Sequence, residues 1–379
     1  MKIKSMVKKS GSGKTVPETC CPTPDTPSCC GPAPSAGGGR IDETVPGFLE
    51  WHPAGSGRVP RISSALLLPD RIGAWKSRWG IGRMNYIVPP GLYAVGYPGA
   101  EDPIVVTANY KMSYDIIRQT LAGRNVWLLV LETYGINVWC AAGKGTFGTE
   151  ELVRRIAASG LSRVVSHRQL ILPILGAPGV AAHEVARSSG FKVNYAAIRA
   201  GDLPRYLDNG RSTTDDMREL TFTFRERLIL LPVEILIALR SAGVLGLLVF
   251  LVTAATGGVS AGIQALLAGA GAAAAGVILA PLLLPWIPGR SFALKGALAG
   301  VVWSIVWLSY GGGREWDLCS SAAALLAMPA LSAYYTLDFT GCSPFPSRTG
   351  VKKEMRIALP LIGCAAAAAI VLVIVGQFF

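Results

Sequence analysis

The sequence carries little charge. Only 16% of its 379 residues are Asp, Glu, Lys or Arg, whereas 51% are apolar. Soluble globular chains average about 25% charged residues, so part of this chain is expected to lie outside water. The mean hydropathy of +0.41 agrees with that expectation. The composition argues against a wholly soluble protein.

The sequence also lacks features of several other protein classes. Met1 to Gly39 contains no apolar stretch that could act as a signal peptide, and the chain is too large for a secreted disulfide scaffold. We therefore expect the first domain to stay in a reducing cytoplasm. The basic residues behind the net charge of +12 are scattered, and no helix-turn-helix or aromatic-basic pattern occurs. No nucleic-acid partner is predicted.

The charge that is present divides the chain at Arg227. Up to this residue there are 28 Lys and Arg against 19 Asp and Glu, but the remaining 152 residues hold only 8 against 5. A Pro/Gly/Ser-rich start without apolar periodicity indicates a flexible tail. We predict three parts: a Cys-containing tail over 1–60, an α/β domain over 61–227, and a membrane domain over 228–379.

Short β-rich runs alternate with amphipathic stretches from about Ile62 to Gly210. This βαβ succession predicts a Rossmann-like α/β domain, with a parallel sheet covered by helices and a ligand at the carboxyl ends of the strands. The predicted elements, in chain order, are the strand Pro103–Asn109, the helix Ser113–Ala122, the strand Asn125–Thr133, the helix Thr149–Ser159, the strand Ser162–Ser166, the helix Val180–Ser189 and the strand Phe191–Ala196.

The second part of the chain contains long uncharged runs. No ionisable residue lies between Arg240 and Arg290, and a helix needs about 20 apolar residues to span a bilayer, so this stretch can cross twice with a turn at Thr256–Ser260. We therefore predict an all-α bundle of five transmembrane helices in a lipid bilayer. The three further spans are Gly296–Gly313, Leu318–Leu337 and Ile357–Phe379.

Basic loops predict the orientation of these spans. Arg290 and Lys295 lie between the second and third spans, and four basic residues of 348–356 lie between the fourth and fifth. By the positive-inside rule, these loops and the α/β domain face the cytoplasmic side of the inner membrane, and the carboxyl terminus faces out.

The predicted spans suit packing more than transport. They contain the small-residue pairs Gly258 with Gly262 and Gly296 with Gly300, which allow helices to approach closely. They hold no cluster of ionisable residues that would mark a transport path. An anchor or partner-docking bundle is favoured over a transporter.

The most informative segment of the α/β domain is Asn137–Lys144, NVWCAAGK, directly after an apolar strand. A thiol at the top of a parallel sheet, beside Trp139 and two alanines, can face a flat ligand. The alternative is a buried free Cys140, a common core residue. No second Cys lies nearby for a redox pair, and a nucleophilic Cys would need a His in reach.

Only three histidines occur in the chain. His52 lies in EWHPAG, which imitates the D-x-H-x-x-G sequence of some corrinoid proteins but has Glu in place of Asp. His167 follows a predicted strand, where it either lines the ligand crevice or lies on the surface. His183 falls within a predicted helix and has no assigned role.

Vicinal cysteine pairs stand in the tail. Their spacing is not that of a ferredoxin, but thiolates favour soft metals, so capture of Hg(II) is one interpretation. A solvated thiol tail is the other. These residues are Cys20, Cys21, Cys29 and Cys30.

Four segments together resemble a known family, the corrinoid protein of microbial mercury methylation. The soluble part alone is also similar to the corrinoid-binding domain of the corrinoid iron-sulfur protein large subunit of the acetyl-CoA pathway. The resemblance covers roughly Val59 to the carboxyl terminus. Its segments are NVWCAAGK, VTANYKMSYD (Val106–Asp115), VPPGLYAVG (Val88–Gly96) and FTGCSPFPSRTGVKKEM (Phe339–Met355).

The resemblance implies a membrane-anchored corrinoid methyltransferase. It would accept a methyl group on cobalt from a methyltetrahydrofolate-dependent donor and transfer it to Hg(II), with Cys140 as the lower axial ligand. A thiolate donates more strongly than imidazole and so raises electron density on the metal. The implied electron donor is a ferredoxin-like protein with two [4Fe-4S] clusters. The implied corrinoid-binding residues are Asn137, Val138, Trp139, Cys140, Ala141, Ala142, Gly143, Lys144, Thr107, Ala108, Asn109, His167, Gly176 and Ala177.

Two other functions stay open at this point. A corrinoid methyl carrier of the acetyl-CoA pathway type, acting on another acceptor, is weakened by the five spans and by the lack of a four-Cys cluster motif. A membrane interaction protein whose α/β domain binds no cofactor is the second.

Overall fold

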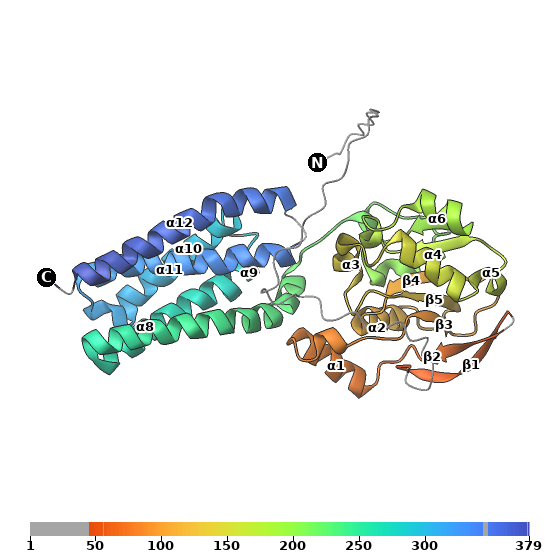
Figure 1. Cartoon of the computed structure of the whole chain (residues 1–379), viewed down its shortest axis with the longest axis horizontal. Helices are drawn as coiled ribbons and strands as arrows, with labels where there is room; N and C mark the ends of the chain where they lie inside the picture. Colours follow the sequence, from red (N-terminus) through yellow and green to blue (C-terminus); the bar gives the residue numbers. More distant parts are fainter. Residues whose placement is uncertain (1–44, 56, 344–347, 377, 379) are drawn as a thin grey trace, which may run out of the picture. The chain divides into compact units, whose positions relative to one another are not determined.

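A computed structural model describes residues 45–55, 57–343, 348–376 and 378 (Figure 1). The cysteine pairs at 20–21 and 29–30 lie outside these residues. The α/β domain contains a seven-stranded mixed sheet with strand order β1-β2-β3-β5-β4-β6-β7. The strands are β1 (Phe48–Ala54), β2 (Gly57–Ile62), β3 (Gly91–Val95), β4 (Ile104–Ala108), β5 (Val126–Leu131), β6 (Gln169–Leu172) and β7 (Lys192–Tyr195).

Four neighbouring strands at the centre and one side of the sheet run parallel. β5, β4, β6 and β7 pair in this order, with Ala108 opposite Leu131 where β4 and β5 end. All residues of β4 and β5 are buried, which explains their continuous apolar sequences. The sheet is not wholly parallel as predicted, because β3 runs antiparallel to β5, and β1 antiparallel to β2.

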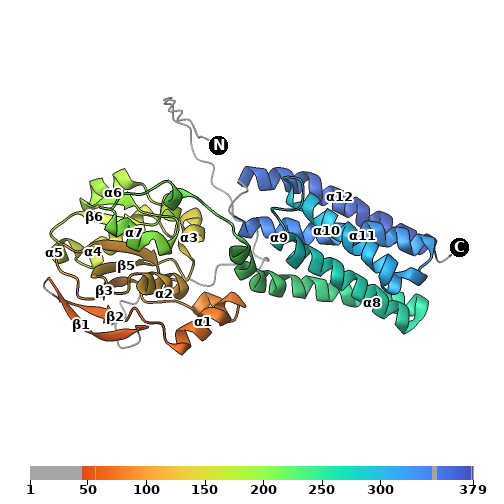
Figure 2. The same cartoon turned by 180° about the vertical axis from the view of Figure 1, so that it is seen from behind.

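Helices cover both faces of the sheet (Figures 1 and 2). One face packs Val106 and Leu129 against a core that includes Ala141, Leu152 and Val185 from three helices. The helices of the domain are α1 (Leu68–Arg78), α2 (Lys111–Thr120), α3 (Val138–Lys144), α4 (Thr149–Ala158), α5 (Leu161–Val164), α6 (Ala182–Ser189) and α7 (Leu203–Asp208), with short 3-10 turns at Arg83–Asn85, Ile174–Gly176, Ala200–Asp202 and Asp216–Arg218.

Two predicted elements are wrong. The strand expected over Ser162–Ser166 is the helix α5, because Gly160 adopts a φ of 59° and the chain makes a new helical turn directly after α4. The strand that completes the unit is β6, whose last three residues are buried. The predicted tail over 1–60 extends too far, since Phe48–Ala54 and Gly57–Ile62 form an antiparallel hairpin.

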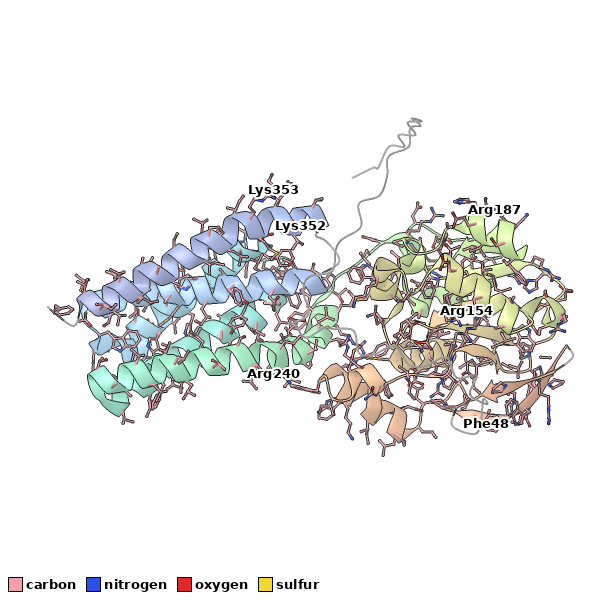
Figure 3. The ribbon with its side chains drawn as sticks, in the orientation of Figure 1. Phe48, Arg154, Arg187, Arg240, Lys352 and Lys353 are labelled. Atoms are coloured by element: carbon pink, nitrogen blue, oxygen red, sulfur yellow. The ribbon has the colours of Figure 1, made fainter. Side chains whose placement is uncertain are left out.

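The described residues from Phe224 onward are mainly helical. Four helices are long and apolar enough to cross a membrane: Phe224–Leu282, Phe292–Tyr310, Leu318–Gly341 and Thr349–Val375. They correspond to α8 (Phe224–Ala274) with a π-helical segment at Ala275–Leu279 and α9 (Ala280–Leu282), α10 (Phe292–Tyr310), α11 (Leu318–Asp338) and α12 (Arg348–Val375). Figure 3 labels Lys352 and Lys353 near the start of α12.

The helix α8 reverses direction at Gly258, whose φ of 82° and ψ of 169° are not helical. A Cβ on Gly246 would lie 2.8 Å from the Leu266 side chain, so the two halves pack side by side. The reversal falls within the predicted turn, 256–260. Glycine suits this site because a side chain would strain a positive φ.

The second predicted small-residue pair does provide close packing. A Cβ on Gly296 would lie 2.7 Å from the carbonyl oxygen of Ser332, and one on Gly300 would lie 2.6 Å from Cα of Pro329. The helix α10 therefore approaches α11 through backbone-to-backbone contact. Gly258 itself acts as a turn residue, and a Cβ there would meet nothing within 4 Å.

Candidate functional site

The candidate site lies where β4 and β5 end, because the loops after parallel strands meet at one edge of a sheet. The loop after β5 leads into α3, which carries the predicted site segment NVWCAAGK. Ala141 and Ala142 on α3 are buried in the main core, whereas Cys140 is exposed and free. The interpretation of Cys140 as a buried core residue is therefore wrong.

The first turn of α3 is fixed by Asn137. Its side-chain oxygen accepts a hydrogen bond of 2.9 Å from the backbone N–H of Cys140. Asn137 has extended backbone angles and is the N-cap of the helix, so the cap acts directly on the residue that carries the thiol. Lys144 and Gly145 end α3, and the φ of 83° at Gly145 suits its glycine.

Asn109, at the end of β4, organises the loop before α3. Its side-chain oxygen accepts hydrogen bonds from the backbone N–H groups of Thr133 and Gly135, both 3.1 Å long. Its amide nitrogen donates to Glu132 over 2.6 Å, and that carboxylate also accepts from the N–H of Tyr134 over 2.9 Å. Asn109 is buried, so it positions the loop and does not face a ligand.

Two glycines in the loop after β6 pack closely against α3 and the residues that follow it. A Cβ on Gly179 would lie 2.2 Å from the carbonyl oxygen of Phe147 and 2.9 Å from Cα of Ala142. A Cβ on Gly176 would lie 2.6 Å from the Phe147 ring. The structure thus brings the predicted residue Gly176, and its neighbour Ala177, beside the cap motif, where they act through packing.

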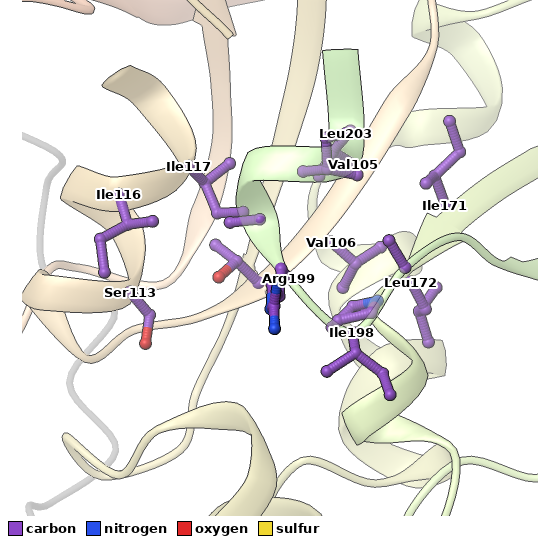
Figure 4. A pocket seen from close by; sticks show the side chains of 14 residues that line it. Val105, Val106, Ser113, Ile116, Ile117, Ile171, Leu172, Ile198, Arg199 and Leu203 are labelled. Atoms are coloured by element: carbon purple, nitrogen blue, oxygen red, sulfur yellow. The ribbon is translucent and has the colours of Figure 1, made fainter. Parts of the chain in front are cut away.

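Three predicted residues are not brought to the exposed surface around Cys140. Thr107 and Ala108 are buried within β4. Thr107 lines a cavity of about 140 Å³ beside α2, with Ser113 and Arg199 among its polar neighbours (Figure 4). His167 precedes β6 and its Nε2 lies 2.9 Å from the carbonyl oxygen of Asp102, at the amino ends of the strands. The expectation that His167 lines the ligand crevice is not met.

The other histidines also lie elsewhere. His52 stands in β1, where its Nε2 is 2.9 Å from the carbonyl oxygen of Pro98 and its ring lies 5.6 Å from that of Trp127. Trp127 is near the amino end of β5. His183 is exposed on α6. Within the described residues, no group of three or more His, Cys, Asp or Glu side chains could hold a metal ion.

Exposed apolar side chains lie on α3, on the loop before it and on the segment that this loop contacts, and sequence reasoning missed most of them. Trp139 and Tyr134 are 40% and 49% exposed, and Tyr134 adopts a φ of 56°, a strained value for a residue with a Cβ. The adjacent Gly135 lies against Ile87, since a Cβ there would be 2.8 Å from its side chain, and both Ile87 and Met84 are exposed. The sequence feature that could have revealed this exposed loop is the Tyr134-Gly135 pair directly after a buried strand.

These residues fit a corrinoid. An exposed thiol is a soft donor for a transition metal, and the exposed apolar side chains of α3, of the loop before it and of residues 84 and 87 suit the face of a large macrocycle. Asn137 and Asn109 fix the segment that carries the thiol, as a ligand that must keep one geometry requires.

A family profile matches the segment with this geometry. Residues 83–196 match the family described as CO dehydrogenase/acetyl-CoA synthase delta subunit. The match runs from the turn at Arg83 to the end of the sheet and contains α3 with Cys140. It covers less than a third of the chain, and the helices from Phe224 onward lie outside it.

Several individual relatives of this segment share the same protein name. The chain is 31% identical over 123 residues to the acetyl-CoA decarbonylase/synthase complex subunit gamma of Archaeoglobus fulgidus, which covers 32% of this chain and 26% of the relative. It is 35% identical over 97 residues to the same subunit of Methanocaldococcus jannaschii, a match that covers 25% of this chain and 20% of the relative. It is 28% identical over 133 residues to subunit gamma 2 of Methanosarcina mazei, covering 33% of this chain and 27% of the relative. The chain spans about a quarter of the length of these relatives.

Proposed function

We propose that this protein is a membrane-anchored corrinoid methyl carrier. The observation that carries the proposal is the exposed thiol of Cys140 on a capped helix at the carboxyl edge of the sheet, within the segment similar to acetyl-CoA decarbonylase/synthase subunits. When bound, the corrinoid supplies a cobalt ion that carries the methyl group between donor and acceptor.

The chain's own residues hold and orient this group. Cys140 would hold the cobalt through its sulfur, and Asn137 keeps the backbone of that residue in place. Trp139, Tyr134 and Ile87 offer apolar contact and keep water from the ligand face. Asn109 holds the loop, and Val138, Ala141, Ala142, Gly143 and Lys144 complete the cap helix.

We further propose the two partners that the family resemblance implies. The methyl donor is a methyltetrahydrofolate-dependent protein, and the electron donor is a ferredoxin-like protein with two [4Fe-4S] clusters. Holding this protein and its electron donor at one membrane raises the effective concentration at which they meet. We place five spans in the bilayer, counting α8 as two on either side of Gly258, with the α/β domain on the cytoplasmic side.

Two methyl acceptors are to be compared. The similarity to subunits of the acetyl-CoA decarbonylase/synthase complex favours an acceptor of the acetyl-CoA pathway, and this alternative has the better support. Hg(II) is the second acceptor. Two features favour it: a thiol ligand, which raises electron density at the methyl group, and the apolar helices that extend beyond the matched segment.

The experiment measures transfer of a labelled methyl group from the loaded full chain. Hg(II) is offered in one reaction, and acetyl-CoA synthase with CO and coenzyme A in the other. We expect transfer in at least one reaction and its loss in Cys140→Ala, while Cys364→Ala, a second exposed free cysteine, transfers normally. Full transfer by Cys140→Ala, or failure of the wild-type chain to retain a corrinoid, would contradict the proposal.

A further inference from the structure

The helix α1 packs on the α/β domain through its polar and small residues. Asp70 accepts hydrogen bonds from Lys111 over 2.5 Å and from Arg118 over 2.8 Å. Ser77 is buried and its hydroxyl lies 2.7 Å from that of Tyr110. Between them, a Cβ at Gly73 would lie 2.6 Å from the Tyr86 hydroxyl. The inward face of α1 is therefore the polar one.

The apolar residues of α1 point the other way. Leu68, Ile72 and Trp75 follow one another at spacings of four and three residues, so they form one stripe along the helix. Their exposed fractions are 69%, 44% and 59%. Trp79 extends the stripe, with its ring 6.2 Å from that of Trp75. A helix that faces water normally shows the opposite arrangement.

Basic residues flank this stripe. Arg71 and Lys76 are exposed and Arg78 is half-buried, and none of the three forms an ion pair with a described residue. The one acidic residue of α1, Asp70, is neutralised inside the domain. The outward face is therefore apolar at its centre and positive at its edges.

We infer that α1 lies on an anionic lipid surface. Apolar side chains including Trp, with Lys and Arg beside them, are the pattern by which an interfacial helix enters the headgroup layer. Each basic residue near such a surface adds attraction. A second copy of the same face would bring like charges together, which disfavours pairing of α1 with itself. This inference rests on the membrane anchoring proposed above.

Photo-crosslinking to lipid tests the inference. The full chain is reconstituted in nanodiscs of phosphatidylcholine with phosphatidylglycerol, with photoreactive p-benzoylphenylalanine in place of Ile72. We expect a phospholipid adduct at this position and only background adduct when the probe replaces His183, an exposed residue of α6. The adduct at position 72 should fall to background when Arg71, Lys76 and Arg78 are all changed to Gln.

A third probe position distinguishes failure of the inference about α1 from failure of the proposed membrane anchoring. In place of Val302, exposed on α10, the probe should crosslink to lipid whenever the helices span the bilayer. Adduct at 302 but not at 72 would overturn the role of α1 alone, whereas no adduct at either would overturn the membrane anchoring. An adduct at 72 with a second copy of the chain, or one of equal yield in phosphatidylcholine alone, would contradict the anionic lipid surface.

Discussion

Cys140 is held in position by the residues next to it in α3. The thiol is exposed, while the backbone N–H of the same residue donates to Asn137. The alanines that follow are buried and fix the helix to the core. The site therefore consists of one reactive atom on a rigid support, and substitutions in the support test it without removing the thiol.

Asn137→Ala should weaken corrinoid retention by about fivefold, because loss of an N-cap costs about 1 kcal/mol and frees the first turn of α3. Asn137→Ser, which can still cap, should restore most of it. Equilibrium dialysis of the cofactor against both variants provides the measurement. Equal retention by wild type and Asn137→Ala would show that the cap does not position the ligand.

Sequence reasoning singled out Cys140 after an apolar strand but left two interpretations of its thiol open. Its immediate sequence, Trp-Cys-Ala-Ala, suits a core and a ligand face equally well. Only the direction of α3 relative to the sheet exposes Cys140 and buries Ala141. Asn109 was assigned to the ligand surface, but its four hydrogen bonds to the loop show a positioning role that depends on tertiary contacts.

At the scale of elements, α3 is seated on the loop that follows β6. No space remains between Gly179 and the backbone of Phe147 and Ala142. This loop contributes nothing to the ligand face through long side chains, yet it sets the height of the cap helix.

Gly179→Ala should therefore destabilise the α/β domain by about 1–3 kcal/mol, since overpacking shifts the backbone, and should reduce corrinoid retention. Gly201→Ala is the matched control, because a Cβ there meets nothing within 4 Å. Urea unfolding followed by protease resistance measures the difference. If both variants unfold alike, the predicted clash beneath α3 does not exist.

The ion network between α1 and α2 predicts an acid-sensitive contact. Burial opposes ionisation of Asp70, but hydrogen bonds from Lys111 and Arg118 outweigh it and hold the pKa of Asp70 below its usual 3.8. A lowered folded-state pKa stabilises the fold fully above the unfolded value, and this contribution is lost as the pH falls through the folded pKa. The stability of wild type should thus decline below about pH 4.

Asp70→Asn should cost about 3 kcal/mol at neutral pH and flatten that decline, because it leaves Lys111 and Arg118 with one carboxylate, that of Asp115, in place of two. Asp208→Asn, which breaks the exposed pair with Arg124, is the control and should change little. Urea titrations from pH 3 to 7 make the comparison. An unchanged acid decline in Asp70→Asn would assign it to other groups.

The elements predicted best are those with strong apolar patterns, such as β4, β5 and α4. The misplaced strand had a different cause, since Val164 and Val165 favour β-structure locally but Gly160 starts a helical turn. The hairpin of β1 and β2 was missed because Pro53, Gly55 and Gly57 resemble a linker. In the fold, these residues lie at the turn between the two antiparallel strands at the edge of the sheet.

For the whole molecule, the proposed orientation in the membrane depends on how many times the chain crosses. The described helices give four candidate spans, and the first contains a reversal at Gly258. Composition located these helices well, because a run without ionisable residues has few alternatives to a membrane. The predicted turn at 256–260 contains the reversal, and the backbone angles of Gly258 show at which residue it lies.

If α8 crosses twice, alkaline phosphatase fused after Gly289 should be inactive, and phosphatase fused after Gly312 should be active, since the enzyme works only outside the cytoplasm. A single crossing by α8 reverses both results. Fusions of a fluorescent protein at the same sites serve as the complementary control, because this protein fluoresces only on the cytoplasmic side.

The central claim is that the sulfur of Cys140 is the lower ligand of a bound corrinoid. Cobalt X-ray absorption spectroscopy of the loaded full chain tests it most directly. The account predicts a sulfur neighbour at cobalt in the wild-type protein and its replacement by nitrogen or oxygen in Cys140→Ala. A nitrogen or oxygen ligand in both proteins, with identical spectra, would contradict it.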